Sequence, residues 1–187
     1  MVHAVEKVRQ RLLRASSALA KSGVHYAVAG GNAVAAWVST IDEAAVRNTQ
    51  DVDILIRRED FDQAKAALES VGFVYRHAAA LDIFLDGADA SPRQGVHLVF
   101  ANEKVRPHEP APNPDVTESE NVVGAGGAFR VLNLDALVRI KLTAWRDKDR
   151  THLRDLIDVG LIDGSWTARL GGELGQRLQS LLDTPDG

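Results

Sequence analysis

The sequence contains no cysteine and only one methionine, and aromatic residues make up 5% of the chain. Without cysteine the chain forms no disulfide, has no thiol nucleophile and offers no thiolate to zinc or to an iron–sulfur cluster. Positive charge is also limited, because 26 aspartates and glutamates outnumber 22 lysines and arginines and leave a formal net charge of −4. The overall charge therefore does not mark a nucleic-acid-binding protein, although a local basic patch can still bind phosphates.

Long apolar runs are missing as well. Residues 1–15 mix charged with apolar side chains and lack the continuous apolar centre of a signal peptide. Residues 22–41 carry no charge and are long enough to span a membrane, but their paired glycines, their Ser, Thr and Asn and their few Leu and Ile favour a buried strand, turn and helix. We therefore expect a cytoplasmic protein without a membrane partner.

The remaining composition is that of a folded domain, with 45% hydrophobic residues over 187 positions. Apolar periodicity predicts an opening helix that ends near Gly23, and turn residues separate the later segments. We expect strands at residues 25–29, 51–56, 73–76, 80–85, 95–101 and 129–132, and helices at residues 33–39, 58–71 and 166–182.

Proline and apolar spacing together divide the chain near residue 132. Four of the six prolines lie between residues 107 and 114, which predicts an irregular surface segment there. From Asn133 onward the apolar spacing is helical. We therefore expect an α/β core at residues 1–132 and a C-terminal helical segment at residues 133–187 that packs on this core.

A double glycine and two aspartates carry the chemical information. Gly30 and Gly31 lie between a predicted strand and a helix for which Asn32 is the expected N-cap. Free backbone N–H groups at such a helix start bind phosphates. Asp51 and Asp53 lie two residues apart on the next strand, so that both carboxylates point to the same face. Paired carboxylates are what a magnesium–phosphate site requires.

This order of strand, double glycine, helix and Asp-x-Asp strand resembles the DNA polymerase β-like nucleotidyltransferase superfamily. Arg47 and Thr49, together with Asp51 and Asp53, look most like the antibiotic nucleotidyltransferases that act on lincosamides and aminoglycosides, and like the nucleotidyltransferase toxins of abortive-infection systems. The resemblance implies an α/β (α+β) fold of the polymerase β-like type, with a mixed, mostly antiparallel sheet, flanking helices and a C-terminal helical segment.

The resemblance also implies a substrate and a cofactor. It implies that Asp51 and Asp53 hold an NTP together with Mg²⁺ or Mn²⁺. It further implies that the triphosphate is contacted by Gly30, Gly31 and the helix that they open, which includes Asn32. Nucleotide is then the expected partner.

Three further residues are candidates for phosphate contacts. Arg47 and Thr49 lie on the loop before the metal strand, where they either bind a phosphate or are simply solvated. Lys141 lies on the inward apolar stripe of a predicted helix, so its ammonium needs an anion or a route to water. In the resembling family a lysine on this helix contacts the nucleotide phosphates. The alternative is a lysine whose stem covers apolar surface.

The resembling family normally takes a third acidic residue from a neighbouring strand, and the matching position here is His97 on the strand at residues 95–101. Imidazole is a poor ligand for Mg²⁺, because hard cations prefer oxygen. Three explanations remain open. His97 acts as a base or as a ligand for a softer metal; Asp82 or Asp86 on the adjoining hairpin supplies the oxygen; or the site is degenerate.

Charged residues of both signs are dense at positions 146–150, and Arg154 and Asp158 follow at a spacing that allows them to pair. A solvated, self-paired helix face is the favoured interpretation of this run. The alternative is that the run contacts nucleotide or a partner.

We therefore predict a nucleotidyltransferase-like protein that moves a nucleoside monophosphate from Mg–NTP to a hydroxyl acceptor, with Asp51, Asp53 and His97 as catalytic residues. RNA, a small molecule and a protein all remain open as the acceptor. The second hypothesis, which His97 favours, is a catalytically impaired relative. Such a protein binds nucleotide or a partner protein within a defence or toxin–antitoxin module.

Overall fold

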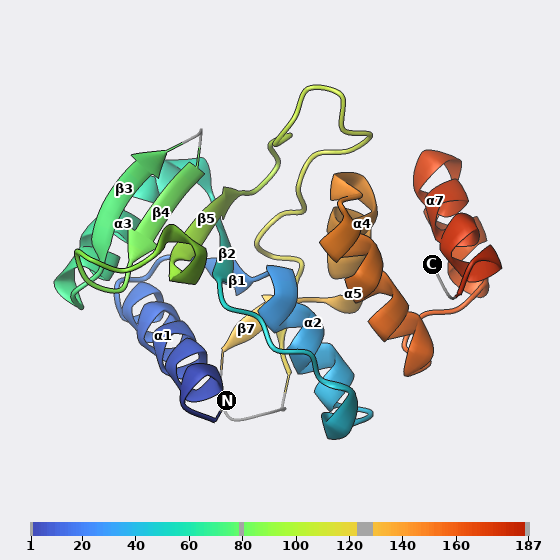
Figure 1. Cartoon of the computed structure of the whole chain (residues 1–187). Coiled ribbons are helices and arrows are strands. Elements are labelled where there is room, and N and C mark those ends of the chain that lie inside the picture. Colours follow the sequence, from blue (N-terminus) through green and yellow to red (C-terminus); the bar gives the residue numbers. More distant parts are fainter. Residues whose placement is uncertain (1, 79–80, 123–128, 186–187) are drawn as a thin grey trace.

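In the computed structural model, which describes residues 2–78, 81–122 and 129–185, one seven-stranded sheet forms the centre of the protein (Figure 1). The strand order is β3-β4-β5-β2-β1-β7-β6. Only β2 with β5 and β1 with β7 pair in parallel, which confirms a mixed, mostly antiparallel sheet. The strands are β1 (Tyr26–Val28), β2 (Val52–Ile56), β3 (Val74–Ala78), β4 (Leu81–Leu85), β5 (Val96–Phe100), β6 (Ser119–Asn121) and β7 (Arg130–Leu132).

Helices flank this sheet in two groups. In the first group α1 and α3 contact each other, and in the second α2 contacts α4 and α5. Figure 1 shows α3 beside β3 and β4, with α4, α5 and α7 on the opposite side of the molecule. The helices are α1 (Val2–Lys21), α2 (Gly30–Ser39), α3 (Phe61–Ser70), α4 (Leu134–Ala144), α5 (Asp147–Asp158), α6 (Ser165–Leu170) and α7 (Gly172–Asp183).

Most predicted elements are confirmed, with small shifts at their ends, and residue 80, the predicted start of β4, lies outside the described residues. The prediction of one helix over residues 166–182 is wrong. The chain breaks it into α6 and α7 at Gly171, whose φ of 62° suits glycine. Strand β6 was not predicted, because its Ser-Glu-Asn sequence shows no apolar alternation. It pairs with β7 through the backbone and through hydrogen bonds from the Arg130 side chain to Ser119.

The register of the central strands decides which side chains meet. Asp53 on β2 lies opposite His97 on β5, and His97 lies opposite Ile83 on β4. Directly opposite residues share one face of a sheet. The neighbours Ile54 and Leu98 are also opposite each other and buried, and they belong to the other face. The sheet therefore presents Asp53 and His97 side by side.

The helices that follow residue 132 pack directly on this framework. Asn133 caps α4, because its side-chain Oδ1 accepts a hydrogen bond from Ala136 N at 2.8 Å. Helix α4 contacts β7, and both α4 and α5 contact α2. The division into residues 1–132 and 133–187 stays a prediction. Over the described part of the chain, no helix combines the length and apolar content of a membrane span.

Helix α5 contains a half-buried histidine whose charge state links folding to pH. His152 Nδ1 is buried and has no hydrogen-bond partner within the described residues. Burial and the nearby Lys141 ammonium lower the pKa of His152 to about 4, from an ordinary value of 6.5. At a pH between these two pKa values, His152 is protonated in the unfolded chain but stays neutral in the folded chain. Its contribution therefore lowers the free energy of unfolding as pH falls.

We expect His152→Gln to recover part of this acid-induced loss. Urea unfolding near neutral pH and again about two pH units lower measures the free energy of unfolding of wild type and variant. The variant should lose about 1 kcal/mol less than wild type, an amount already reduced for solvent screening. The exposed His25 offers a control, His25→Gln, which should follow wild type. Parallel pH dependence of all three proteins would contradict the assignment.

Candidate active site

Two carboxylates and one imidazole converge at the start of β2. A carboxylate oxygen of Asp51, one of Asp53 and a ring nitrogen of His97 all lie within 4.8 Å of one another. The parallel register of β2 and β5 brings His97 to Asp53, and their Nδ1 and Oδ1 atoms are 3.5 Å apart. The predicted catalytic residues are therefore neighbours in space.

The double glycine is required by the close approach of this cluster to α2. Gly30 has a φ of 61°, and a Cβ at this position would lie 1.9 Å from Asp53 Oδ2. A Cβ on Gly31 would lie 3.0 Å from the Cβ of Thr49. Thr49 in turn donates a hydrogen bond from Oγ1 to Asp51 Oδ1 at 2.6 Å. The glycines thus let the start of α2 lie directly against the strand that carries the aspartates.

The prediction of Asn32 as the N-cap is wrong. Helix α2 begins at Gly30 and its N-cap is Ala29, which places Asn32 inside the first turn. The Asn32 Nδ2 atom donates to the Asp51 carbonyl at 2.7 Å instead. Asn32 therefore fixes the backbone of the metal strand, and the N–H groups at the start of α2 keep no side-chain cap.

The orientation of His97 is set by its second ring nitrogen. Nε2 lies 2.8 Å from the carbonyl oxygen of Pro92, which can only accept a hydrogen bond. Nε2 is therefore the protonated nitrogen, and Nδ1 faces the carboxylates as the position for a proton or for a cation. The Asp53 carboxylate raises the pKa of His97 against the opposing effect of burial.

Positively charged groups surround the carboxylate of Asp53. Burial alone would raise the pKa of Asp53, but His97, Lys141 and Lys148 together outweigh burial and hold this pKa below its ordinary value. The Lys148 ammonium also lies 3.7 Å from Asp51 Oδ2. Asp53 is thus available as an anion.

Asp82 and Asp86, the other candidates for the third acid, both point elsewhere. Asp82 precedes Ile83, the residue opposite His97, so its side chain lies on the other face of the sheet. There Asp82 Oδ1 accepts a hydrogen bond from the Tyr75 hydroxyl at 2.7 Å. Asp86 binds Arg11 and Arg14 on α1. His97 is therefore the third member of the cluster.

Lys141 has the anion that its buried position required. Its ammonium lies 3.0 Å from Asp149 Oδ1, and both side chains are at most 4% exposed. Arg146 Nε donates to the other carboxylate oxygen at 2.7 Å, so that one buried carboxylate holds two cations. Burial opposes ionisation of Asp149, but Lys141 and Arg146 outweigh it and lower its pKa.

Residues 146–150 are mostly exposed and pair among themselves, as interpreted from the sequence, because Arg146 pairs with Asp149 and Arg150 with Asp147. The run is not only a solvated face, however, because Asp149 is buried. Arg146, Lys148 and Asp149 border the cavity that contains the cluster. Arg154 donates to the Thr184 carbonyl, and no ion pair between Arg154 and Asp158 occurs in the described part of the chain. The sequence carried no capping signature here, because Arg146 at the N-cap position of α5 offers no hydrogen-bond acceptor; Asp149 at N3 instead accepts a hydrogen bond from the Arg146 backbone nitrogen.

A cavity of about 470 Å³ joins most of these groups, and it includes Gly30, Asp51, Asp53, His97 and Lys141 among the predicted residues. Arg47, Thr49 and Asn32 instead border a smaller cavity of about 160 Å³. The Arg47 Nε atom lies 2.7 Å from Asp155 on α5, and Gly31 borders neither cavity. Phosphate binding by Arg47, Thr49, Asn32 and Gly31 stays a prediction.

A family comparison agrees with this arrangement. The model of a family described as uncharacterised nucleotidyltransferase matches residues 3–162. The chain belongs to this nucleotidyltransferase family. No curated protein matches the chain.

Solved structures of nucleotidyltransferases share the fold. The solution structure of the antibiotic-resistance factor ANT(2″)-Ia is 14% identical with a TM-score of 0.59, and the similarity covers 97% of this chain and 93% of that one. Its crystal structure in complex with adenylyl-2″-tobramycin gives 14% identity, a TM-score of 0.58 and coverage of 93% and 96%. An antigenic nucleotidyltransferase-like protein from Paracoccidioides brasiliensis gives 17% identity, a TM-score of 0.60 and coverage of 98% and 91%. The predicted resemblance is confirmed.

In this nucleotidyltransferase we expect Asp149→Asn to lower the free energy of unfolding by about 3 kcal/mol, because it leaves the Lys141 ammonium buried without its anion. Urea unfolding measures the change. Asp147→Asn is the matched control, since Asp147 lies in the same helical turn with a side chain that is 93% exposed. The control should cost less than about 0.5 kcal/mol. Equal losses in both variants would show that the Lys141–Asp149 pair does not stabilise the fold.

Proposed function

We propose that this nucleotidyltransferase-like protein transfers a nucleoside monophosphate from a metal-bound NTP to an acceptor hydroxyl. The observation that carries the proposal is the cluster of Asp51, Asp53 and His97 beside Gly30 and Lys141 in one cavity. In the reaction, the acceptor oxygen bonds to the α-phosphorus while the bond from this phosphorus to the β-phosphate bridging oxygen breaks. Pyrophosphate leaves, and the hydroxyl proton passes to a base.

The donor set fits a divalent cation, because two carboxylate oxygens and one imidazole nitrogen lie within 4.8 Å of one another. Asp51 and Asp53 would hold Mg²⁺ or Mn²⁺ there, and such a cation supplies charge neutralisation to the phosphate oxygens. His97 Nδ1 faces the reacting centre and serves as a proton acceptor or as a third ligand, with Nε2 fixed by Pro92.

The surrounding residues position the triphosphate. Gly30, Gly31 and Asn32 form the first turn of α2, whose N–H groups and dipole attract phosphate. Lys141 and Lys148 place positive charge beside Asp53, where the departing pyrophosphate gains charge. Arg47 and Thr49 orient the loop that carries Asp51. Arg47 does so by donating a hydrogen bond to Asp155, and Thr49 by donating one to the Asp51 carboxylate.

A second candidate function is favoured by one observation, namely the imidazole at position 97 where an acid is expected. A relative with a weakened cation site would bind nucleotide without turnover, within a defence or toxin–antitoxin module. In both cases we place the protein in the cytoplasm.

The test compares wild type with Asp51→Asn/Asp53→Asn. Each protein is incubated with α-labelled NTPs, with Mg²⁺ or Mn²⁺, and with pooled RNA, protein and small hydroxyl compounds that include aminoglycosides, because tobramycin is adenylylated in the ANT(2″)-Ia complex. We expect transfer by wild type and a loss of at least about a hundredfold in the variant. Asp62→Asn/Asp89→Asn removes the same charge at exposed positions outside the cavity and should keep activity. Nucleotide binding without transfer supports the second function, and the absence of binding overturns both.

His97 also predicts a metal preference. Because an imidazole nitrogen suits Mn²⁺ better than Mg²⁺, wild type should bind Mn²⁺ more tightly. His97→Asp replaces the nitrogen by oxygen and should improve Mg²⁺ affinity relative to Mn²⁺ by about tenfold. Isothermal titration calorimetry of both cations in the presence of a non-hydrolysable NTP analogue measures the ratio. An unchanged ratio would show that His97 does not contact the cation.

A further inference from the structure

The cavity extends well beyond the catalytic cluster. It follows β5 from His97 to Phe100, and we call the part beyond Val99 its outer end. The outer end is bordered by Arg58, by the start of β4 and by the loop at residues 101–113, which Figure 1 shows rising between β5 and α4. The outer end is thus the part of the cavity that lies beyond the cluster.

The carboxylates of the cavity all have partners. In the cluster, Asp51 and Asp53 face Lys148 and His97. Further along, Asp149 binds Lys141 and Arg146, and Asp82 accepts from Tyr75. At the outer end, Arg58 donates to both oxygens of Glu103, and Glu109 accepts two backbone hydrogen bonds. Each carboxylate that borders the cavity therefore already has an ion-pair or hydrogen-bond partner.

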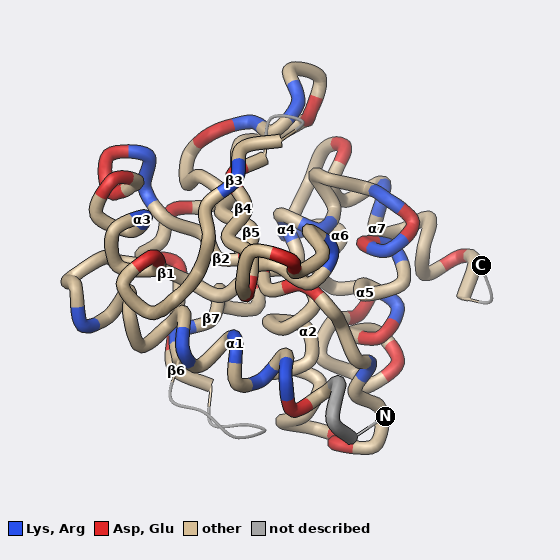
Figure 2. Tube along the Cα trace, turned by 60° about the vertical axis from the view of Figure 1, so that its left-hand side comes forward, with Lys and Arg blue, Asp and Glu red and all other residues tan. Residues whose placement is uncertain are grey.

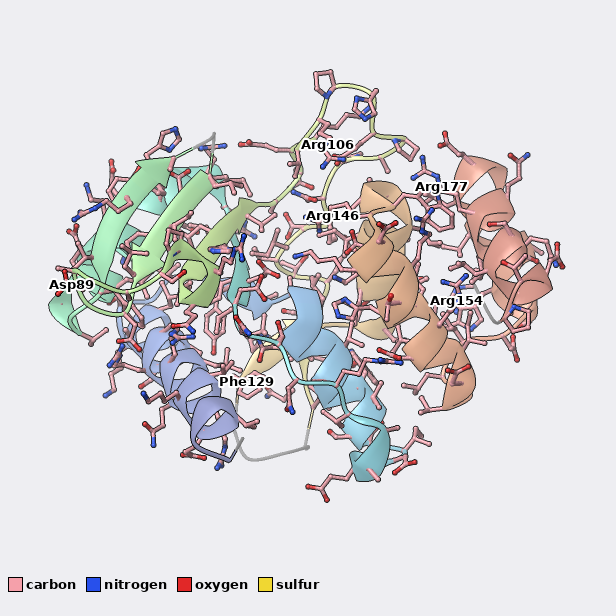
Figure 3. All side chains as sticks on the ribbon, in the orientation of Figure 1. Asp89, Arg106, Phe129, Arg146, Arg154 and Arg177 are labelled. Carbon is pink, nitrogen blue, oxygen red and sulfur yellow. The ribbon has the colours of Figure 1, made fainter. Side chains whose placement is uncertain are left out.

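Two basic side chains at the outer end of the cavity have no hydrogen-bond or ion-pair partner among the described residues. Lys104 and Arg106 are exposed, border the cavity, and form no side-chain hydrogen bond or ion pair within the described residues. Figure 3 shows Arg106 on the loop above Arg146, which borders the same cavity. Figure 2 shows basic (blue) and acidic (red) segments on this loop, which forms the top of the molecule in that view.

The position of these two bases is fixed by buried groups. Glu109 is 6% exposed, and its Oε2 accepts from the backbone nitrogens of Val105 at 3.0 Å and Arg106 at 3.2 Å. Asn113 is 5% exposed, and it donates from Nδ2 to the Phe100 carbonyl at 2.9 Å. The Asn113 backbone also pairs with that of Glu103. The loop therefore holds Lys104 and Arg106 against the cavity.

Apolar surface lies next to the two bases. Leu81 and Val105 are 43% and 61% exposed, and both border the cavity from different elements. Exposed apolar side chains at the mouth of a cavity indicate contact with carbon-rich parts of a ligand.

We propose that the acceptor is a hydroxyl compound that carries phosphate, whose anionic group is bound by Lys104 and Arg106 at the outer end of the cavity. A polycationic acceptor would meet two unpaired positive charges and no free carboxylate. A phosphate forms charge-assisted hydrogen bonds with both bases. An RNA end and a small phosphorylated sugar share this chemistry. The proposal rests on the proposed nucleotidyl transfer.

The test measures binding of three probes to the full chain with Mn²⁺ and a non-hydrolysable ATP analogue present. The probes are a fluorescent 12-nucleotide RNA, ribose 5-phosphate as its competitor, and tobramycin. We expect RNA or ribose 5-phosphate to bind and tobramycin not to bind. Competition by ribose 5-phosphate identifies a small phosphorylated acceptor, and binding of RNA alone identifies a nucleic-acid end.

Lys104→Gln/Arg106→Gln should weaken binding of the phosphate probe by about tenfold or more, with unchanged affinity for the ATP analogue. Lys7→Gln/Lys21→Gln, which removes the same charge from exposed positions of α1 outside the cavity, should leave both affinities unchanged.

Three results overturn the proposal while leaving nucleotidyl transfer in place: tobramycin binds, neither phosphate probe binds, or both double variants weaken the phosphate probe equally. A parallel loss of ATP-analogue affinity in Lys104→Gln/Arg106→Gln would also overturn it, because the bases would then serve the NTP. Wild type that fails to bind even the ATP analogue would refute the proposed function itself.

Discussion

The parallel pairing of β2 with β5 in one register is the constraint on which the site depends. Side chains alternate along a strand, so a slip by one residue would remove His97 from Asp53 and turn an apolar residue toward the carboxylate. The apolar residues of the opposite face prevent such a slip. Val52, Ile54 and Val96 are 0% exposed there, and a slip would turn them toward the cavity. Packing of the apolar face of the sheet thus keeps Asp53 and His97 opposite each other on the other face.

Helix α5 then completes the site from beyond the predicted boundary at residue 132. Through Asp149 it fixes Lys141, and through Asp155 it holds Arg47 on the loop that leads to Asp51. Lys148 of the same helix reaches Asp51 directly. Burying the Asp149 carboxylate with the cations of Lys141 and Arg146 costs desolvation free energy. In return, both cations are held in fixed positions near Asp51 and Asp53. The site therefore belongs to both parts of the chain.

The residues of the cluster could be predicted because their signals are local: a double glycine, two aspartates at strand spacing, and a lysine on an apolar helix stripe. The partner of Lys141 could not. Asp149 lies eight positions later, inside a mixed-charge run, and beyond a left-handed turn at Trp145 that no sequence pattern marks. The Asn32 prediction failed for a related reason. Gly30 adopts a positive φ against Asp53, so α2 starts earlier than capping chemistry alone suggests.

The imidazole at position 97 changes the charge of the site as well as its ligand set. A third carboxylate would place three acidic side chains at the start of β2, whereas here two aspartates face His97 and the Lys148 ammonium. A free divalent cation is therefore attracted less strongly, and the phosphates of an NTP are repelled less. Under the proposed function, cation and nucleotide would stabilise each other, since each would supply the charge that the other lacks. We accordingly expect the cation to enter as its NTP complex, with the nucleotide contributing the oxygen ligands that His97 does not.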